Sequence, residues 1–350
     1  MDLVFLIVAG AFALSIGGLA VFSDGADDVA ESDVDEGEES EAGELLSFAD
    51  GPDVTGTEGD DTIIATGDIG EADGPPRGFS LDLLGGDDVA RFNDFQMATI
   101  NAGSGDDTII STGGASVKVN LEGGDDYFDL SRERSFDVDV SGGEGDDFIR
   151  FGEGDFNSVE GGSGNDTIEV GAGVSASGGP GDDVITITGT VSQSGTSVDA
   201  GNGDDVLNIT ARAGFTLFSG LGTATTIDAT TGEGADVVNL SLTIEERPSD
   251  PGSYPPSILV GVVGQITDFD VGQDTLRVEI FRSGDTLDRV IDPALIAPVE
   301  ADDPYNLTFE AAATAIALDL TASFRIFADG PLTLDDIEIV GLDPAAGGGA

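Results

Sequence analysis

The chain lacks cysteine, histidine and tryptophan entirely, and it has only 12 lysine and arginine residues in 350. Without cysteine no disulfide framework can form, and without cysteine or histidine the chain has no thiolate or imidazole ligand for zinc or copper. The missing histidine also removes the commonest general base and the usual nucleophilic triads. We therefore expect that the protein is not an enzyme and that any metal site uses oxygen ligands.

The few basic residues are outnumbered by 69 aspartate and glutamate residues, which gives a formal net charge of −57. Self-repulsion of this size destabilises a compact state unless cations neutralise it. The same negative field makes nucleic acid and anionic lipid headgroups poor partners. The 53 glycine residues do not indicate disorder, because most of them recur at regular intervals.

What the chain does contain is a glycine-rich loop that runs into an aspartate and an apolar residue nine times. The fullest copies are GGEGDDFI (Gly142–Ile149), GGSGNDTI (Gly161–Ile168) and GGPGDDVI (Gly178–Ile185). We call the aspartate two residues before the final apolar residue of each copy the anchor. The nine anchors are Asp61, Asp88, Asp107, Asp126, Asp147, Asp166, Asp183, Asp205 and Asp236.

Apolar residues lie at two fixed offsets from every anchor. Two residues after the anchors stand Ile63, Ala90, Ile109, Phe128, Ile149, Ile168, Ile185, Leu207 and Val238. Seven residues before them stand Val54, Leu81, Ile100, Val119, Val140, Val159, Ala176, Val198 and Ala229. This alternation predicts a half-buried strand on each side of every loop.

The spacing of the anchors predicts a solenoid. Successive anchors are 27, 19, 19, 21, 19, 17, 22 and 31 residues apart. A nonapeptide repeat gives about 18 residues for a full turn with two edges. We therefore expect one turn for each intact loop, with the loops stacked along one edge and a loop without the aspartate on the opposite edge.

A glycine stands two residues before the anchor in all nine copies, which indicates a positive φ or a close approach of the next coil. An irregular backbone of this kind frees carbonyl oxygens beside the anchor carboxylates. Oxygen ligands, about six to eight for each ion, suit Ca²⁺ better than Mg²⁺. We expect ions between successive loops, about seven in all, with Asp236 in a capping loop. The candidate ligands are the anchors from Asp61 to Asp205 with Gly105, Gly124, Gly143, Gly145, Gly162, Gly164, Gly179, Gly181 and Gly203.

On these loops, the segment Val54–Val238 resembles the repeats-in-toxin (hemolysin-type) calcium-binding family. The resemblance implies a parallel β-roll in which the anchor aspartates and backbone carbonyls bind Ca²⁺. ITDFDVGQDTLRV (Ile266–Val278) and LTLDDIEIV (Leu332–Val340) resemble segments that close such repeat regions in secreted bacterial proteins. The alternative is that the Gly-Asp pairs are ordinary hairpin turns.

Outside the loops, the sequence predicts three further regions. Residues 1–23 contain the uncharged run Leu3–Phe22, long enough as a single helix of about 30 Å to cross a bilayer. A membrane anchor, a cleaved signal segment and a buried helix all remain open for this run. Residues 24–53 are an acidic, disordered linker by composition. Residues 54–240 form the roll, and 241–345 a small C-terminal β domain that caps it.

The fold class predicted is therefore all-β, a parallel β-roll with one calcium-binding edge. We expect a calcium-binding, surface-displayed or secreted bacterial protein with a structural or adhesive role, which folds on calcium outside the cytosol. Its expected partners are Ca²⁺, surface polysaccharide or matrix, and a membrane through residues 3–22. The alternative is a polysaccharide-processing enzyme, since carboxylates alone can hydrolyse glycosides, or an exported toxin-like effector that uses the roll for folding and secretion.

Overall fold

The computed structural model describes residues 43–48, 51–66, 75–130, 135–188, 195–213, 227–245, 259–283, 291–298, 303–311 and 320–340. These residues belong to one compact unit, Ser40–Ala350. The predicted N-terminal helix and most of the acidic linker lie outside them. Within the described ranges there is no α-helix, and η2 (Leu334–Asp336) is a 3-10 helix. No helix in this part of the chain is long and apolar enough to cross a membrane.

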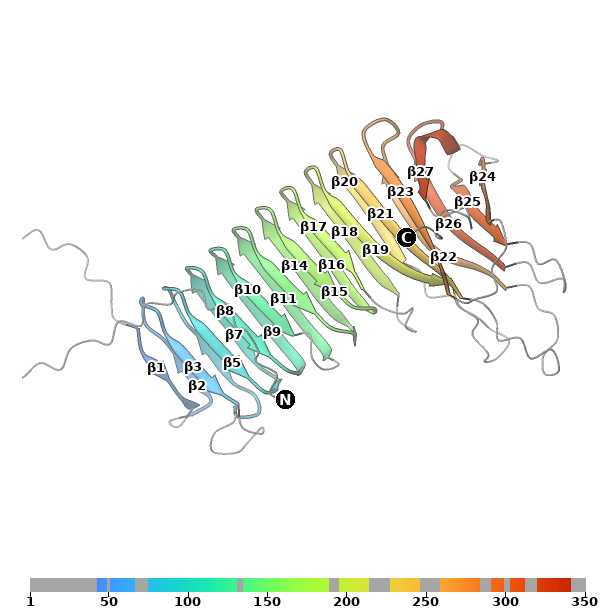
Figure 1. Cartoon of the computed structure of the whole chain (residues 1–350). Coiled ribbons are helices and arrows are strands. Elements are labelled where there is room, and N and C mark those ends of the chain that lie inside the picture. The colour runs from blue at the N-terminus through green and yellow to red at the C-terminus, as the bar shows by residue number, and fades with distance from the viewer. Residues whose placement is uncertain are drawn as a thin grey trace, which may run out of the picture. The chain divides into compact units, whose positions relative to one another are not determined.

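The described strands form two long sheets whose strands stack in a row from β1 to β27 (Figure 1). The first is a 12-stranded sheet in which all neighbours are parallel. Across this sheet the strands are β1 (Leu45–Leu46), β3 (Thr62–Ala65), β5 (Val89–Phe92), β8 (Thr108–Ser111), β10 (Tyr127–Leu130), β12 (Phe148–Phe151), β15 (Thr167–Val170), β17 (Val184–Ile187), β19 (Val206–Ala213), β21 (Val237–Glu245), β23 (Thr275–Ser283) and β27 (Ile337–Val340).

The second sheet has 15 strands and is parallel except at its C-terminal end, where β25 pairs antiparallel with both β26 and β24. The main path runs through β2 (Asp53–Thr55), β4 (Ser80–Asp82), β7 (Thr99–Ser104), β9 (Gly114–Gly123), β11 (Ser135–Glu144), β14 (Asn157–Ser163), β16 (Val174–Pro180), β18 (Thr196–Asn202), β20 (Ile227–Glu233), β22 (Leu259–Phe269), β26 (Leu320–Ala328), β25 (Tyr305–Ala311) and β24 (Ile291–Ile296). The short strands β6 (Phe95–Gln96) and β13 (Gly154–Asp155) pair with β9 and β11.

Each turn gives one strand to each sheet, and the register places residues one repeat apart side by side. Ile149 is paired with Phe128 of the preceding turn and with Ile168 of the next. Every glycine loop leads from a strand of the 15-stranded sheet into a strand of the 12-stranded sheet. The predicted parallel solenoid with one turn for each loop is therefore confirmed, and the loops follow one another along one edge.

The core lies between the two sheets and consists of the side chains at the two fixed offsets from the anchors. Every predicted inward position is buried except Val54, which is half-buried near the N-terminal end of the sheet. The burial pattern alternates along the strands, as at β8, β10, β12 and β15. Apolar burial of roughly 25 cal/mol per Å² therefore stabilises every turn independently of the loops.

The two sheets continue on both sides of the region with intact loops. β22 and β26 extend the 15-stranded sheet, and β23 and β27 extend the 12-stranded sheet. The strands expected after residue 240 are thus present and pair with those of the roll. β1 lies within the stretch that the sequence assigns to the acidic linker, and it pairs in parallel with β3.

Candidate metal centre

The anchors form a column of buried aspartates at the loop edge, because each loop enters its strand in the same register. All nine are 0–2% exposed. Asp274 extends the column by one turn, since Asp236 donates its N–H to Asp274 Oδ1. Asp274 was not predicted as an anchor, although Gly272 stands two residues before it as in the nine copies, because Thr267 takes the place of the apolar residue seven positions before it. The apolar Leu276 two residues later is the signal that could have found it.

Backbone hydrogen bonds connect this column from turn to turn. The N–H of each anchor donates to Oδ1 of the anchor in the following turn, as from Asp107 to Asp126 at 2.7 Å. The same bond recurs at all nine steps from Asp61 to Asp274, with lengths of 2.6–3.1 Å. One carboxylate oxygen of every anchor after Asp61 is therefore used by the chain itself.

A second, exposed ladder runs beside the first through the residues that precede the anchors. Here the N–H donates in the opposite sense, to Oδ1 of the preceding turn, as from Asp125 to Asp106 at 2.9 Å. Asn165 takes part with its amide oxygen, which accepts the N–H of Asp182. Ala235 donates to Asp204 and has no oxygen to continue the ladder. This ladder explains why the position holds aspartate or asparagine in the earlier copies.

The loop glycines adopt backbone conformations that other residues rarely reach. Of the nine glycines two residues before the anchors, all but Gly59 have positive φ, from 105° at Gly86 to 156° at Gly234. A Cβ added at Gly124 would lie 2.0 Å from the carbonyl oxygen of Gly105 in the preceding turn. The positive φ and the close approach of another turn, the two reasons expected for glycine at this position, are therefore both present. The nine glycines predicted as calcium ligands all have a positive φ.

The second oxygen of most anchors is buried without a hydrogen-bond partner among the described residues. This holds for Oδ2 of Asp88, Asp107, Asp126, Asp147, Asp166, Asp183, Asp205 and Asp236. A buried polar atom left unsatisfied costs about 1–3 kcal/mol, and more if the group is charged. Eight such atoms lie in successive turns, and bound cations would satisfy them.

The electrostatics of the column agree with this geometry. Burial, followed by repulsion from neighbouring aspartates, raises the pKa of these carboxyls above the usual 3.8, although the N–H from the preceding turn lowers it in part. The pKa reaches about 7 at Asp88, Asp107, Asp126, Asp147 and Asp166, and about 6 at Asp183, Asp205 and Asp236. A metal-free column near neutral pH therefore carries carboxyls that resist ionisation.

Oxygens of successive turns converge on a small space in the fullest copies. A Cβ added at Gly142 would lie 2.2 Å from Asp147 Oδ2 and 2.2 Å from the carbonyl oxygen of Gly161. The same construction at Gly178 meets Asp183 Oδ2 at 2.1 Å and the next turn's carbonyl at 2.3 Å. No side chain therefore fits at these two positions, and the carboxylate and carbonyl oxygens lie directly against the glycine backbone. The described residues contain no group of three acidic side chains placed to hold a metal, so carbonyls would supply most ligands.

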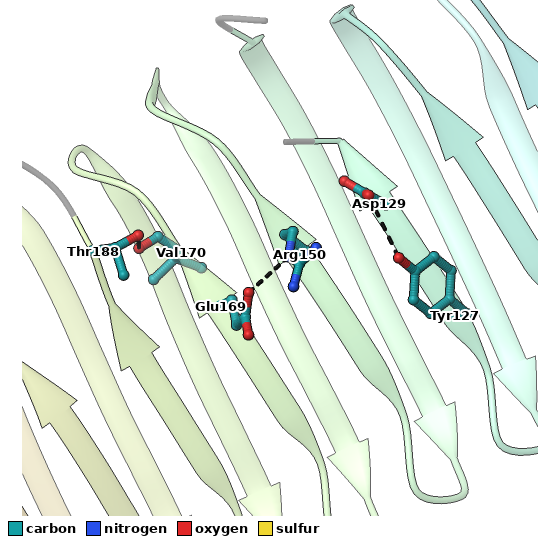
Figure 2. A network of polar contacts seen from close by, with 6 residues as sticks. All are labelled: Tyr127, Asp129, Arg150, Glu169, Val170 and Thr188. Carbon is teal, nitrogen blue, oxygen red and sulfur yellow. Dashed lines mark hydrogen bonds and ion pairs between the residues drawn. The ribbon is translucent and has the colours of Figure 1, made fainter. Parts of the chain in front are cut away.

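A separate polar cluster lies on the outward side of the 12-stranded sheet (Figure 2). Arg150 Nε donates to Glu169 Oε2 at 2.7 Å, and the guanidinium lies 5.1 Å from the ring centre of Phe148. Phe148 stacks on Tyr127, with ring centres 5.2 Å apart. Tyr127 donates to Asp129 at 3.5 Å, and burial raises its pKa. The Arg150–Glu169 and Tyr127–Phe148 contacts join neighbouring strands.

No protein-family model, no curated protein and no solved structure matches the chain.

Proposed function

We propose that the protein is a calcium-binding structural protein, surface-displayed or secreted, whose roll folds when its loops bind calcium outside the cytosol. The observation that carries the proposal is the row of eight buried Oδ2 atoms without a hydrogen-bond partner in the described part of the chain. The carboxylates of Asp88 to Asp236, together with carbonyl oxygens of the glycine loops, would hold the ions. Such hard oxygen donors favour Ca²⁺.

The bound ions would supply positive charge where the carboxylates are most crowded. With a formal net charge of −57, the folded chain repels itself, and no site of this kind exists in the unfolded chain. The free energy of binding then becomes free energy of folding. Cytosolic calcium is too low to fill weak sites, which supports a location outside the cell or at its surface. Surface polysaccharide or matrix, and a membrane through residues 3–22, are the further partners proposed.

The test is a titration followed by circular dichroism and by terbium luminescence. Calcium added to chelated protein should raise the β signal cooperatively, and a fully folded roll in excess chelator would contradict the proposal. Terbium bound beside Asp126 should be sensitised by Tyr127, the next residue in the chain. The matched control is Tyr127→Phe, which should lose most luminescence and keep the folding transition. Calcium should displace the bound terbium.

A further inference from the structure

The two ends of the aspartate column differ from its middle. Asp61 Oδ2 accepts the backbone N–H of Thr57 at 2.6 Å, and its Oδ1 accepts the Thr57 hydroxyl at 3.2 Å. The backbone N–H of Glu44, in the register of the preceding turn, also donates to Asp61 Oδ1. Both oxygens of Asp61 are therefore satisfied by the chain, unlike those of the next eight anchors.

Asp274 shows the same arrangement at the other end. Its Oδ1 accepts the N–H of Asp236 at 3.1 Å, and its Oδ2 accepts the N–H of Asp270 at 2.8 Å. The N–H of Asp274 donates in return to the carbonyl oxygen of Asp270 at 2.9 Å. A turn of five residues thus closes over the last carboxylate. At this turn the chain supplies a donor where the inner turns leave Oδ2 unpaired.

From this contrast we infer that backbone N–H groups replace the cation at Asp61 and Asp274, so the metal-dependent column runs from Asp88 to Asp236 and ends there. The inference rests on the proposed calcium binding and adds which turns of the column are the first and the last to bind an ion. It assigns Asp236 to the metal-binding turns, whereas the sequence alone predicts a cap there. Asp236 Oδ2 is buried and unpartnered within the described region, and only its Oδ1 accepts an N–H, from Asp205 at 2.9 Å.

The inference separates two kinds of aspartate that occupy one column. An Asp→Asn substitution leaves the oxygen that accepts the N–H of the neighbouring turn and replaces the other oxygen with an amide nitrogen, which cannot bind a cation. At an inner turn this change removes a metal ligand. At an end turn the same change places the amide against the N–H of Thr57 or Asp270, which weakens the fold without removing a ligand.

The experiment measures bound calcium per chain by equilibrium dialysis on the full chain, at saturating calcium. Asp205→Asn and Asp236→Asn should each lose at least one bound ion. Asp61→Asn and Asp274→Asn should bind as many ions as the unsubstituted chain. The inference is overturned if either end variant loses as many ions as Asp205→Asn, or if Asp236→Asn loses none. An unsubstituted chain that binds no calcium would instead overturn the proposed function.

Hydrogen exchange on the unsubstituted chain covers the case in which an end variant does not fold. A stepwise reduction of calcium should increase amide exchange at the inner loops, such as 142–147, at least tenfold more than at 270–274 before the roll as a whole unfolds. The turn at 270–274 keeps its own donors and needs no ion for them. Equal increases at the two segments would overturn the inference even if all four variants were unusable.

Discussion

At the scale of single residues, the anchor aspartates combine two opposing demands. One carboxylate oxygen of each anchor accepts an N–H from the neighbouring turn, and this hydrogen bond fixes the position of the carboxylate. Each of the eight inner anchors buries its other oxygen without a partner in the described chain. A buried unpaired oxygen is destabilising by itself, so these residues favour the folded state only when something neutralises them.

The pH dependence of the metal-free protein follows from the raised pKa values. For Asp107, Asp126 and Asp147 the pKa rises from 3.8 to about 7 on folding, so their contribution favours folding fully below pH 3.8. It is lost as the pH rises towards about 7, because the unfolded carboxyls are then ionised and folding has to take up protons. In chelator, the β signal measured by circular dichroism should therefore be larger at pH 4.5 than at pH 7.5.

The matched control for this pH effect is Asp147→Asn, which cannot titrate. In chelator, its β signal should depend less on pH than that of the unsubstituted chain. An equal dependence in both would show that the acid effect comes from the exposed carboxylates and the net charge.

A glycine substitution tests the close approach of successive turns. At Gly145, with φ of 132°, an added Cβ would lie 2.0 Å from the carbonyl oxygen of Gly124. Gly145→Ala should lower the free energy of unfolding in calcium by more than about 3 kcal/mol, because strain and collision add. At Gly272 the φ of 104° is equally unfavourable, but no atom lies within 4 Å of the Cβ position. Gly272→Ala should cost only about 1 kcal/mol. Chemical unfolding measures both variants, and a similar loss of unfolding free energy in Gly145→Ala and Gly272→Ala would contradict the predicted collision.

At the scale of strands and turns, the sequence predicted most of the roll because its pattern is local. Apolar residues at fixed offsets from Asp107 or Asp147 determine which side of each strand is buried, and the 19-residue spacing determines the register. β1 could not be found in this way, since two leucines in an acidic run show no period. The turn at Asp274 was missed because Thr267 breaks the apolar pattern before it. The unpaired oxygens of the column could not be predicted, because they depend on contacts between turns.

Core packing makes a prediction for two phenylalanine residues on the adjacent strands β10 and β12. Phe128 is fully buried between the sheets, and Phe148 lies on the outward side of the next strand. Phe128→Ala should cost about 3–5 kcal/mol in calcium through lost burial and the cavity it leaves. Phe148→Ala should cost less than half as much. Thermal or denaturant unfolding measures both, and equal losses would contradict the inward and outward assignment.

At the scale of the whole molecule, charge repulsion and site binding can be separated. The formal charge of −57 means that any salt reduces repulsion in the folded chain. Specific sites should make a few millimolar CaCl₂ stabilise the protein far more than NaCl or MgCl₂ at equal ionic strength. Thermal unfolding in the three salts measures this difference. Equal stabilisation would indicate general screening and contradict the proposed sites.

The two ladders of hydrogen bonds also bear on how long such a molecule can be. The inner ladder points towards the following turn and the outer ladder towards the preceding one, so the turns from Asp88 to Asp205 offer their neighbours the same set of donors and acceptors. A turn of about 19 residues could then be duplicated or deleted in the gene without creating an unmatched group. Length would be free to vary in the middle of the chain, while only the two end turns have to be unique.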